Sequence, residues 1–102
     1  MSADDAVQLE RALLGTCDVV ASQKEGGDRK NEEGLSFTFG RDGMGGYNAM
    51  GIPLNFKYRL EGRNVLMSQG YEAFRVDDWS GPELRLFVYD LSTTFICRKR
   101  GA

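Results

Sequence analysis

The spacing of apolar and polar residues changes once along the chain, at Gly15. Over residues 3–14, apolar side chains recur at intervals of three and four, as Ala6, Leu9 and Leu13 show. This spacing predicts a short amphipathic helix. Because a helix of this length is marginally stable alone, we expect it to pack against the rest of the domain, across one end.

From residue 15 to residue 100 the apolar positions follow a period of two, which is typical of strands with one buried face. The clearest segment is 54–60, where Leu54 and Phe56 alternate with polar residues. Turn signals recur about every ten residues with no helical segment between them, which favours an antiparallel meander. We therefore predict one all-β domain, an up-and-down meander of about eight strands that closes into a small barrel and so removes its exposed edges. The predicted strands cover residues 16–21, 35–39, 54–60, 65–68, 71–76, 83–89 and 93–98, and the stretch 22–34 is predicted to be a long polar loop.

The segment 44–53 is apolar for a loop and poorly patterned for a strand. One interpretation is an irregular strand with a bulge whose apolar groups fill the core. The other is a flexible flap over the barrel mouth or a partner-binding surface, since Met and Tyr suit adaptable apolar contacts. The candidate binding residues here are Met44, Tyr47, Met50 and Ile52.

A second candidate surface is the turn-rich loop 77–82, which contains Trp79, the only tryptophan. Trp79 either folds back onto the domain or is exposed. In the second case it is a candidate interface anchor, flanked by Asp77 and Asp78.

The barrel interior is predicted to be filled by side chains, because eight short strands enclose little space. This expectation weakens the hypothesis of a lipid pocket and moves the predicted binding surface to the loops. The side chains expected inside are Phe37, Phe39, Phe56, Tyr58, Met67, Phe74 and Phe95.

Composition excludes several kinds of chemistry. The chain of 102 residues has no histidine, which rules out Ser-His-Asp and Cys-His catalysis and imidazole metal sites. The glycine-rich stretch 40–46 lacks the residues of a phosphate loop, and Asp18 is predicted to point outward into solvent. We predict no enzyme activity, no cofactor and no metal.

Charge and hydropathy limit the partners. The net charge of −2 gives no electrostatic footprint for nucleic acid or an anionic membrane. The N-terminus is acidic, no signal-like apolar run follows it, and no stretch is long and apolar enough to cross a bilayer. A cytoplasmic protein, either monomer or homodimer, is therefore expected.

Several short motifs resemble small bacterial lipocalin-like domains. The segment 14–20, with Leu14-Gly15-Thr16, is similar to their opening Leu-x-Gly-Thr-Trp-x-Val strand. Phe37-x-Phe followed by Asp42-Gly43 looks like their second strand and turn. The segment 58–62 resembles their Tyr-x-Leu-x-Gly, and Leu84-x-Leu with a last strand ending in Arg98 resembles their C-terminal end.

The resemblance implies an up-and-down barrel preceded by a short helix. It also implies that the first and last strands are neighbours, with a basic residue of the last strand packed near the tryptophan of the first. Cys17 replaces that tryptophan here, while Arg98 or Arg100 can supply the basic residue. Cys17 and Cys97 then lie on neighbouring strands, and in a reducing cytoplasm we expect them to be free thiols.

The predicted function is a non-enzymatic protein-binding module, such as an inhibitor, an immunity-type protein or an accessory subunit, that uses the loops at the barrel ends. The alternative is a lipocalin-like carrier of a small apolar ligand, because one fold supports many functions.

Overall fold

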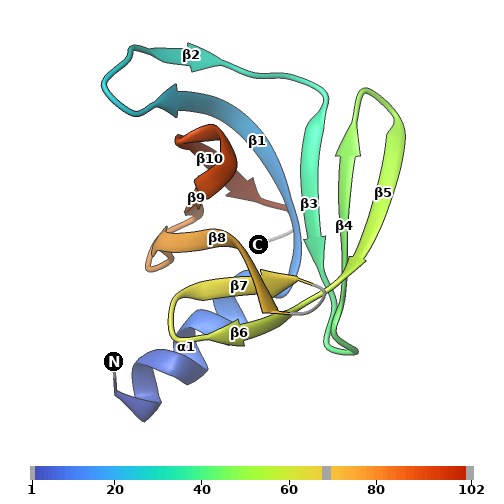
Figure 1. Ribbon diagram of the computed structural model, residues 1–102, viewed down its shortest axis with the longest axis vertical. Coiled ribbons are helices and arrows are strands. Elements are labelled where there is room, and N and C mark those ends of the chain that lie inside the picture. Colours follow the sequence, from blue (N-terminus) through green and yellow to red (C-terminus); the bar gives the residue numbers. More distant parts are fainter. Residues whose placement is uncertain (1, 68–69, 101–102) are drawn as a thin grey trace.

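The N-terminal helix, α1 (Ala3–Leu13), lies against one end of the strands that follow (Figure 1), and its apolar side chains belong to the core cluster. The computed structural model describes residues 2–67 and 70–100. Ser2 caps the helix by accepting a hydrogen bond from the backbone N–H of Asp5 at 3.2 Å. Leu9 and Leu13 are almost fully buried in the core. The predicted helix and its packing against the domain are confirmed.

The strands form one antiparallel sheet that curls into a nearly closed barrel (Figure 1). Along the sheet the order is β5-β4-β3-β1-β10-β9-β8-β7-β6, and β2 pairs with β1 outside this path. The predicted all-β fold with antiparallel strands is confirmed. The strands are β1 (Gly15–Lys24), β2 (Arg29–Asn31), β3 (Leu35–Phe39), β4 (Met44–Ala49), β5 (Ile52–Lys57), β6 (Arg59–Glu61), β7 (Asn64–Met67), β8 (Tyr71–Asp78), β9 (Glu83–Val88) and β10 (Thr93–Lys99), with a 3-10 turn at Tyr89–Leu91.

Two segments differ from the prediction. The stretch 22–34 is not one loop, because β1 continues to Lys24 and β2 pairs back onto it through backbone hydrogen bonds. The predicted strand 54–60 divides at Tyr58 into β5 and β6. The backbone N–H of Tyr58 donates to the carbonyl of Gly43 at 2.9 Å, and its hydroxyl donates to the carbonyl of Gly40 at 2.7 Å. This bend carries the chain from one end of the sheet to the other. Residue 68 of the predicted strand 65–68 lies outside the described residues.

A disulfide joins β1 to β10, which are neighbours in the sheet. The Cα atoms of Cys17 and Cys97 are 5.4 Å apart, within the range that a disulfide spans, and both side chains are buried. The prediction of two free thiols is therefore wrong, whereas the predicted pairing of the first and last strands is confirmed. The bond closes a chain segment with a sequence separation of 80 residues.

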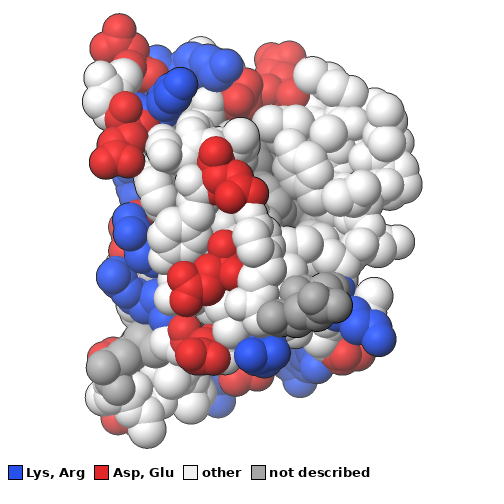
Figure 2. Space-filling view, in the orientation of Figure 1, with Lys and Arg blue, Asp and Glu red and all other residues white. Residues whose placement is uncertain are grey.

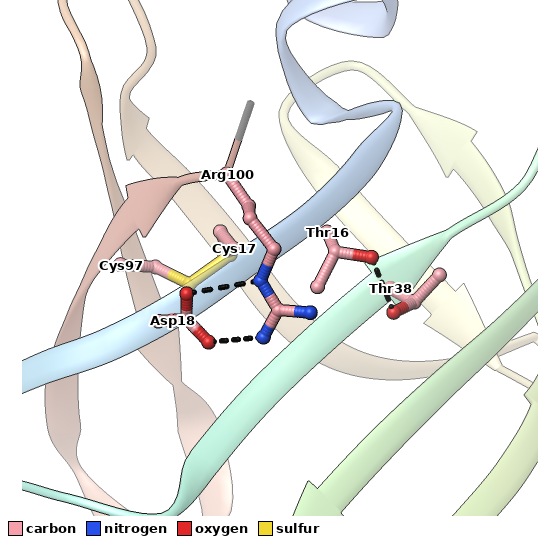
Figure 3. Close-up of a disulfide and its surroundings, with 6 residues drawn as sticks. All are labelled: Thr16, Cys17, Asp18, Thr38, Cys97 and Arg100. Carbon is pink, nitrogen blue, oxygen red and sulfur yellow. Dashed lines mark hydrogen bonds and ion pairs between the residues drawn. A yellow bond between two sulfur atoms is a disulfide. The ribbon is translucent and has the colours of Figure 1, made fainter. Parts of the chain in front are cut away.

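An ion pair lies beside the disulfide, between Asp18 of β1 and Arg100, the residue that follows β10 (Figure 3). The guanidinium of Arg100 donates two hydrogen bonds to the carboxylate of Asp18, one from Nε at 3.1 Å. This hydrogen bonding lowers the pKa of Asp18. Asp18 points outward as predicted but is paired rather than simply solvated. Arg100 pairs with Asp18, and Arg98 pairs with Glu83 at 3.4 Å. The packing of either arginine against Cys17, which the resemblance implied, stays a prediction.

Aromatic side chains fill much of the barrel interior, as the alternation predicted. Phe37 lies at the centre of the cluster, with ring centroids 4.9 Å from Tyr47 and 5.4 Å from Phe74. The side chains of Phe37, Phe39, Phe56, Phe74 and Phe95 are buried, and Tyr58 and Met67 pack against them half-buried. The filling is nevertheless incomplete, and the space left over forms the candidate site.

Candidate functional site

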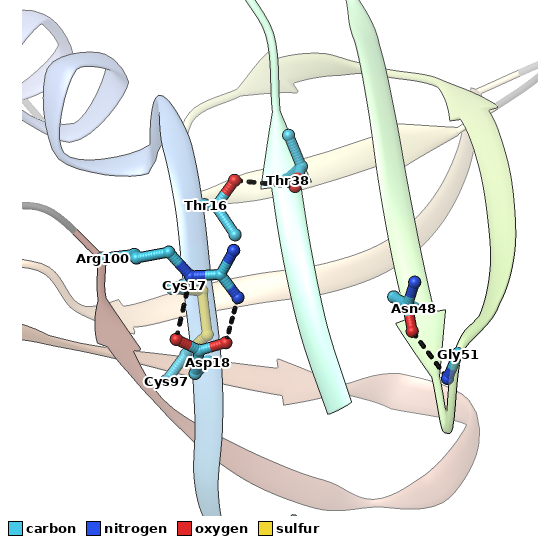
Figure 4. Close-up of polar contacts among 8 residues, drawn as sticks. All are labelled: Thr16, Cys17, Asp18, Thr38, Asn48, Gly51, Cys97 and Arg100. Carbon is cyan, nitrogen blue, oxygen red and sulfur yellow. Dashed lines mark hydrogen bonds and ion pairs between the residues drawn. A yellow bond between two sulfur atoms is a disulfide. The ribbon is translucent and has the colours of Figure 1, made fainter. Parts of the chain in front are cut away.

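Strands β4 and β5 form a regular hairpin, which we call the edge hairpin. Its two-residue turn, Met50-Gly51, has φ of +52° and +83°, the signs required by a type I′ turn. The side-chain carbonyl of Asn48 accepts the N–H of Gly51 at 3.0 Å (Figure 4), and the N–H of Met50 donates to the carbonyl of Gly34 at 2.7 Å. The segment 44–53 is therefore not the irregular, bulged strand that one interpretation of the sequence suggested.

The edge hairpin exposes large apolar side chains. Met50 is 75% exposed, Ile52 71% and Leu54 60%. No charged residue occurs from Met44 to Phe56. Figure 2 shows the result as an uncharged lobe at the upper right, where β4 and β5 lie in Figure 1. An exposed apolar surface of this kind is typical of a binding site.

One face of the edge hairpin continues from the core into solvent. Alternation along β5 places Ile52, Leu54 and Phe56 on the same face. Exposure falls along this face from 71% at Ile52 to 60% at Leu54 and 8% at Phe56. Tyr47 pairs with Leu54 across the hairpin and shares the face. This inner face is thus an apolar strip that leads from the turn into the barrel.

The strip ends in an apolar cavity of about 230 Å³. Leu54 on one side and Leu91 on the other are both more than half exposed, so the cavity is accessible from solvent. Among the described residues of the lining, Tyr47 contributes the single polar side-chain group. The lining residues are Phe37, Tyr47, Leu54, Phe56, Met67, Phe74, Val88, Leu91 and Phe95.

Gly45 allows Phe56 to lie flat against β4 beside this cavity. The two residues are opposite each other in the hairpin register. A Cβ atom built on Gly45 would lie 2.4 Å from the Phe56 ring, far inside van der Waals contact. The glycine at this position therefore sets the ring position and helps to shape the cavity wall.

The candidate residues of segment 44–53 occupy different parts of the edge hairpin. Tyr47 lines the cavity, Ile52 lies on the same inner face, and Met50 occupies the turn. Met44 is 40% exposed and, by alternation, lies on the outer face. Burial, with a smaller effect from the charge of Glu32, raises the pKa of Tyr47, so this hydroxyl is neutral at pH 7.

The second candidate group, at 77–82, makes local structural contacts. Trp79 is half-buried against the core, which agrees with the interpretation that it folds back. Asp77 accepts hydrogen bonds from the guanidinium of Arg75, one at 3.1 Å. Asp78 accepts hydrogen bonds from the backbone N–H and the hydroxyl of Ser80, each at 3.2 Å, and these contacts lower the pKa of Asp78.

The two candidate groups lie at opposite ends of the barrel. The carbonyl of Pro82 accepts a hydrogen bond from the N–H of Lys99 at the end of β10, and the N–H of Arg100 donates to the carbonyl of Thr16 near the start of β1. Residue 50, in contrast, bonds to Gly34 just before β3, whose far end pairs with Gly15. The predicted residues therefore do not form one surface, and the binding role of either group remains a prediction.

Sequence reasoning missed the cavity and the lining residues Leu54, Val88 and Leu91 as site residues. The expectation of a filled interior came from the little space that eight short strands enclose and from the inward aromatic side chains. The sequence does not give the tilt of the rings, and the space left between them depends on that tilt. The signal that was available is the uncharged run from Met44 to Phe56, which extends beyond the predicted loop into the strand.

The arrangement can hold an apolar group, and among the described lining residues the Tyr47 hydroxyl is the single titratable group. Among residues 2–67 and 70–100, no cluster of three or more carboxylates or thiols is placed to hold a metal ion. No helix in the described part of the chain is long and apolar enough to cross a membrane.

Comparison with known proteins shows that solved structures share this fold. Neither a family model nor a curated protein matches the sequence. A solved lipocalin-like protein from Bacteroides uniformis superimposes with a TM-score of 0.67 at 20% identity, covering 86% of this chain and 98% of the other. An uncharacterised protein from Bacteroides eggerthii gives a TM-score of 0.63 at 15% identity, with 85% and 98% covered. The predicted resemblance is confirmed at the level of structure: the chain has the lipocalin-like fold.

Proposed function

We propose that the protein is a non-enzymatic binding protein that holds an apolar group in the cavity beside the edge hairpin. The observation that carries this proposal is the cavity of about 230 Å³, whose lining is apolar apart from the Tyr47 hydroxyl. An apolar cavity of about 150 Å³ is enough to bind benzene. A single aromatic ring or a branched aliphatic group therefore matches the space available.

The direct test is titration of the protein with toluene, followed by nuclear magnetic resonance. We expect saturable shifts at Leu54, Phe74 and Val88. Val88→Phe adds a ring to the lining and should abolish these shifts while the protein stays folded. The matched control is Val7→Phe, at a half-exposed position of α1 outside the cavity. If toluene causes no saturable shifts, or if both variants bind it like the wild type, the proposal is wrong.

The second candidate, a protein partner, is favoured by the exposure of Met50 and Ile52 beyond the cavity entrance. Apolar side chains on a surface anchor protein interfaces, where a few residues supply most of the affinity. The loop 77–82 has weaker support, because Trp79 is half-buried and the two aspartates are engaged in local hydrogen bonds.

We also propose that the protein acts in an oxidising compartment, instead of the cytoplasm expected from its N-terminal residues. The buried disulfide between Cys17 and Cys97 supports this proposal, since structural disulfides are rare in a reducing cytosol. Acid quenching of cells followed by thiol labelling provides the test. Labelling of both cysteines without prior reduction would contradict it.

A further inference from the structure

The cavity lies next to a sheet edge. β5 is an end strand of the sheet, and among the described residues it pairs with β4 alone. The register fixes which backbone groups face away from β4. Ile52 is opposite Ala49 across the two-residue turn, and Tyr58 donates its N–H to Gly43, so the even-numbered residues of β5 bond to β4. The N–H and C=O groups of Asn55 and Lys57 therefore point outward along the edge.

We infer that the edge hairpin binds an extended segment of another protein, which adds a strand beside β5 and places an apolar side chain in the cavity. This inference rests on the proposed function, because it states that the apolar group in the cavity is a side chain of the partner segment. Strand addition of this kind combines main-chain hydrogen bonds, which supply affinity, with pockets for alternate side chains, which supply specificity.

The geometry of the edge predicts the partner's sequence pattern. Residues directly opposite one another in a sheet point to the same face. A partner residue opposite Leu54 or Phe56 therefore points toward the cavity, which those two side chains line. A partner residue opposite Asn55 points to the outer face, where Asn55 and Pro53 line a polar groove. The expected ligand is apolar at alternate positions, with an acidic residue near the exposed Lys57.

A second copy of this chain is a poorer occupant of the same edge. Pro53 points its backbone nitrogen outward but has no N–H to donate. In a symmetric antiparallel pair centred on Asn55, Pro53 of each copy faces Lys57 of the other. Each Lys57 carbonyl then lacks a donor. Proline at an edge suppresses pairing between identical sheets, whereas a different segment can start its hydrogen bonds at Asn55.

The experiment selects octapeptides from a random displayed library against the intact, oxidised protein, and measures the consensus peptide by calorimetry. Asn55→Pro removes the outward N–H without touching the bonds to β4, as Pro53 already does two residues earlier. We expect Asn55→Pro to weaken binding at least about tenfold, the effect of losing one hydrogen bond or more. The matched control Asn55→Ala keeps the N–H and removes only the side chain, so it should weaken binding clearly less than Asn55→Pro does. Methylating the peptide nitrogen that faces Asn55 should weaken binding to the wild type in the same way, which provides a test that needs no variant.

Each outcome bears on the inference. An alternating apolar consensus, with sensitivity to Asn55→Pro and to the methylated nitrogen, supports it. Absence of such a consensus, or equal binding by Asn55→Pro and Asn55→Ala, overturns it. A dimer in analytical ultracentrifugation that Asn55→Pro dissociates also overturns it and makes a second copy the occupant. Toluene titration of the same samples separates the two proposals: toluene binding without peptide binding rejects only this inference, and loss of both rejects the proposed function.

Discussion

The β1–β10 pair and the edge hairpin are both antiparallel pairs of the same sheet, but their surroundings are opposite. Strands β1 and β10 each have neighbours on both sides and are joined by the disulfide between Cys17 and Cys97. Among the described residues strand β5 has one neighbour, and its apolar side chains become exposed toward the turn. We call the paired strands β1 and β10, with their disulfide, the disulfide wall. The difference teaches that the region built for stability is separate from the region proposed here for binding.

The largest effect should come from removing the disulfide. In the chain-entropy description, a cross-link over about 80 residues stabilises the folded state by about 4.5 kcal/mol. Cys17→Ala combined with Cys97→Ala should lower the free energy of unfolding by roughly that amount in urea titrations. Well below the new midpoint, toluene affinity should be unchanged. If oxidised and reduced wild-type protein unfold at the same urea concentration, the disulfide wall is not the stable region.

Substitution of one isoleucine in each region allows a direct comparison of their contributions to stability. Ile96 on β10 is 1% exposed, whereas Ile52 on β5 is 71% exposed. Ile96→Ala should lower the free energy of unfolding by about 2–5 kcal/mol, since it leaves a cavity in a packed core. Ile52→Ala should change it by less than about 0.5 kcal/mol and act on binding instead. Equal losses of stability in the two variants, measured by urea denaturation, would remove the distinction between the regions.

Two adjacent glycines test how the cavity wall is built. Gly45→Ala places a Cβ against the Phe56 ring and should cost about 1–3 kcal/mol through overpacking. The displaced ring should also alter toluene affinity. Gly46→Ala meets its nearest atom, Asn55 Oδ1, at 3.4 Å, an ordinary contact, and serves as the control with little expected change. A neutral Gly45→Ala variant would show that Phe56 does not depend on the glycine.

The smallest effect concerns the hairpin turn, where Met50 has φ of +52°. Asparagine favours this left-handed region and the first position of a type I′ turn. Met50→Asn should therefore raise the free energy of unfolding by about 0.5–1 kcal/mol, while Met50→Val should lower it. The exposed methionine would then be retained for binding at a cost in stability. A destabilised Met50→Asn variant would contradict this explanation.

The fold was largely predictable because the alternation of apolar and polar residues indicates which face of each strand is buried. Leu54 and Phe56 were placed on the inner face by their spacing, and the burial of Phe56 confirms it. The bend at Tyr58 was not predictable, since it depends on hydrogen bonds to Gly40 and Gly43 from a distant turn. Alternation continues through Tyr58 without a break in the pattern.

The candidate site was less predictable because it depends on distances between strands. The disulfide requires a specific Cα separation, and the compartment inferred from the N-terminus led to the opposite expectation for Cys17 and Cys97. The cavity depends on ring tilt, such as the 76° angle between the planes of Phe37 and Phe74. Side-chain number and type do not determine such angles.

The central claim is that the disulfide wall supplies stability and the edge hairpin supplies binding. Native-state hydrogen exchange with and without toluene tests this claim most directly. We predict that the amides of Val19 and Cys97 exchange only through global unfolding, with equal free energies. The amides of Tyr47 and Leu54 should exchange through a local opening of lower free energy, and toluene should raise their protection above the change in global stability. Uniform exchange across both regions, or toluene protection confined to the disulfide wall, would contradict this account.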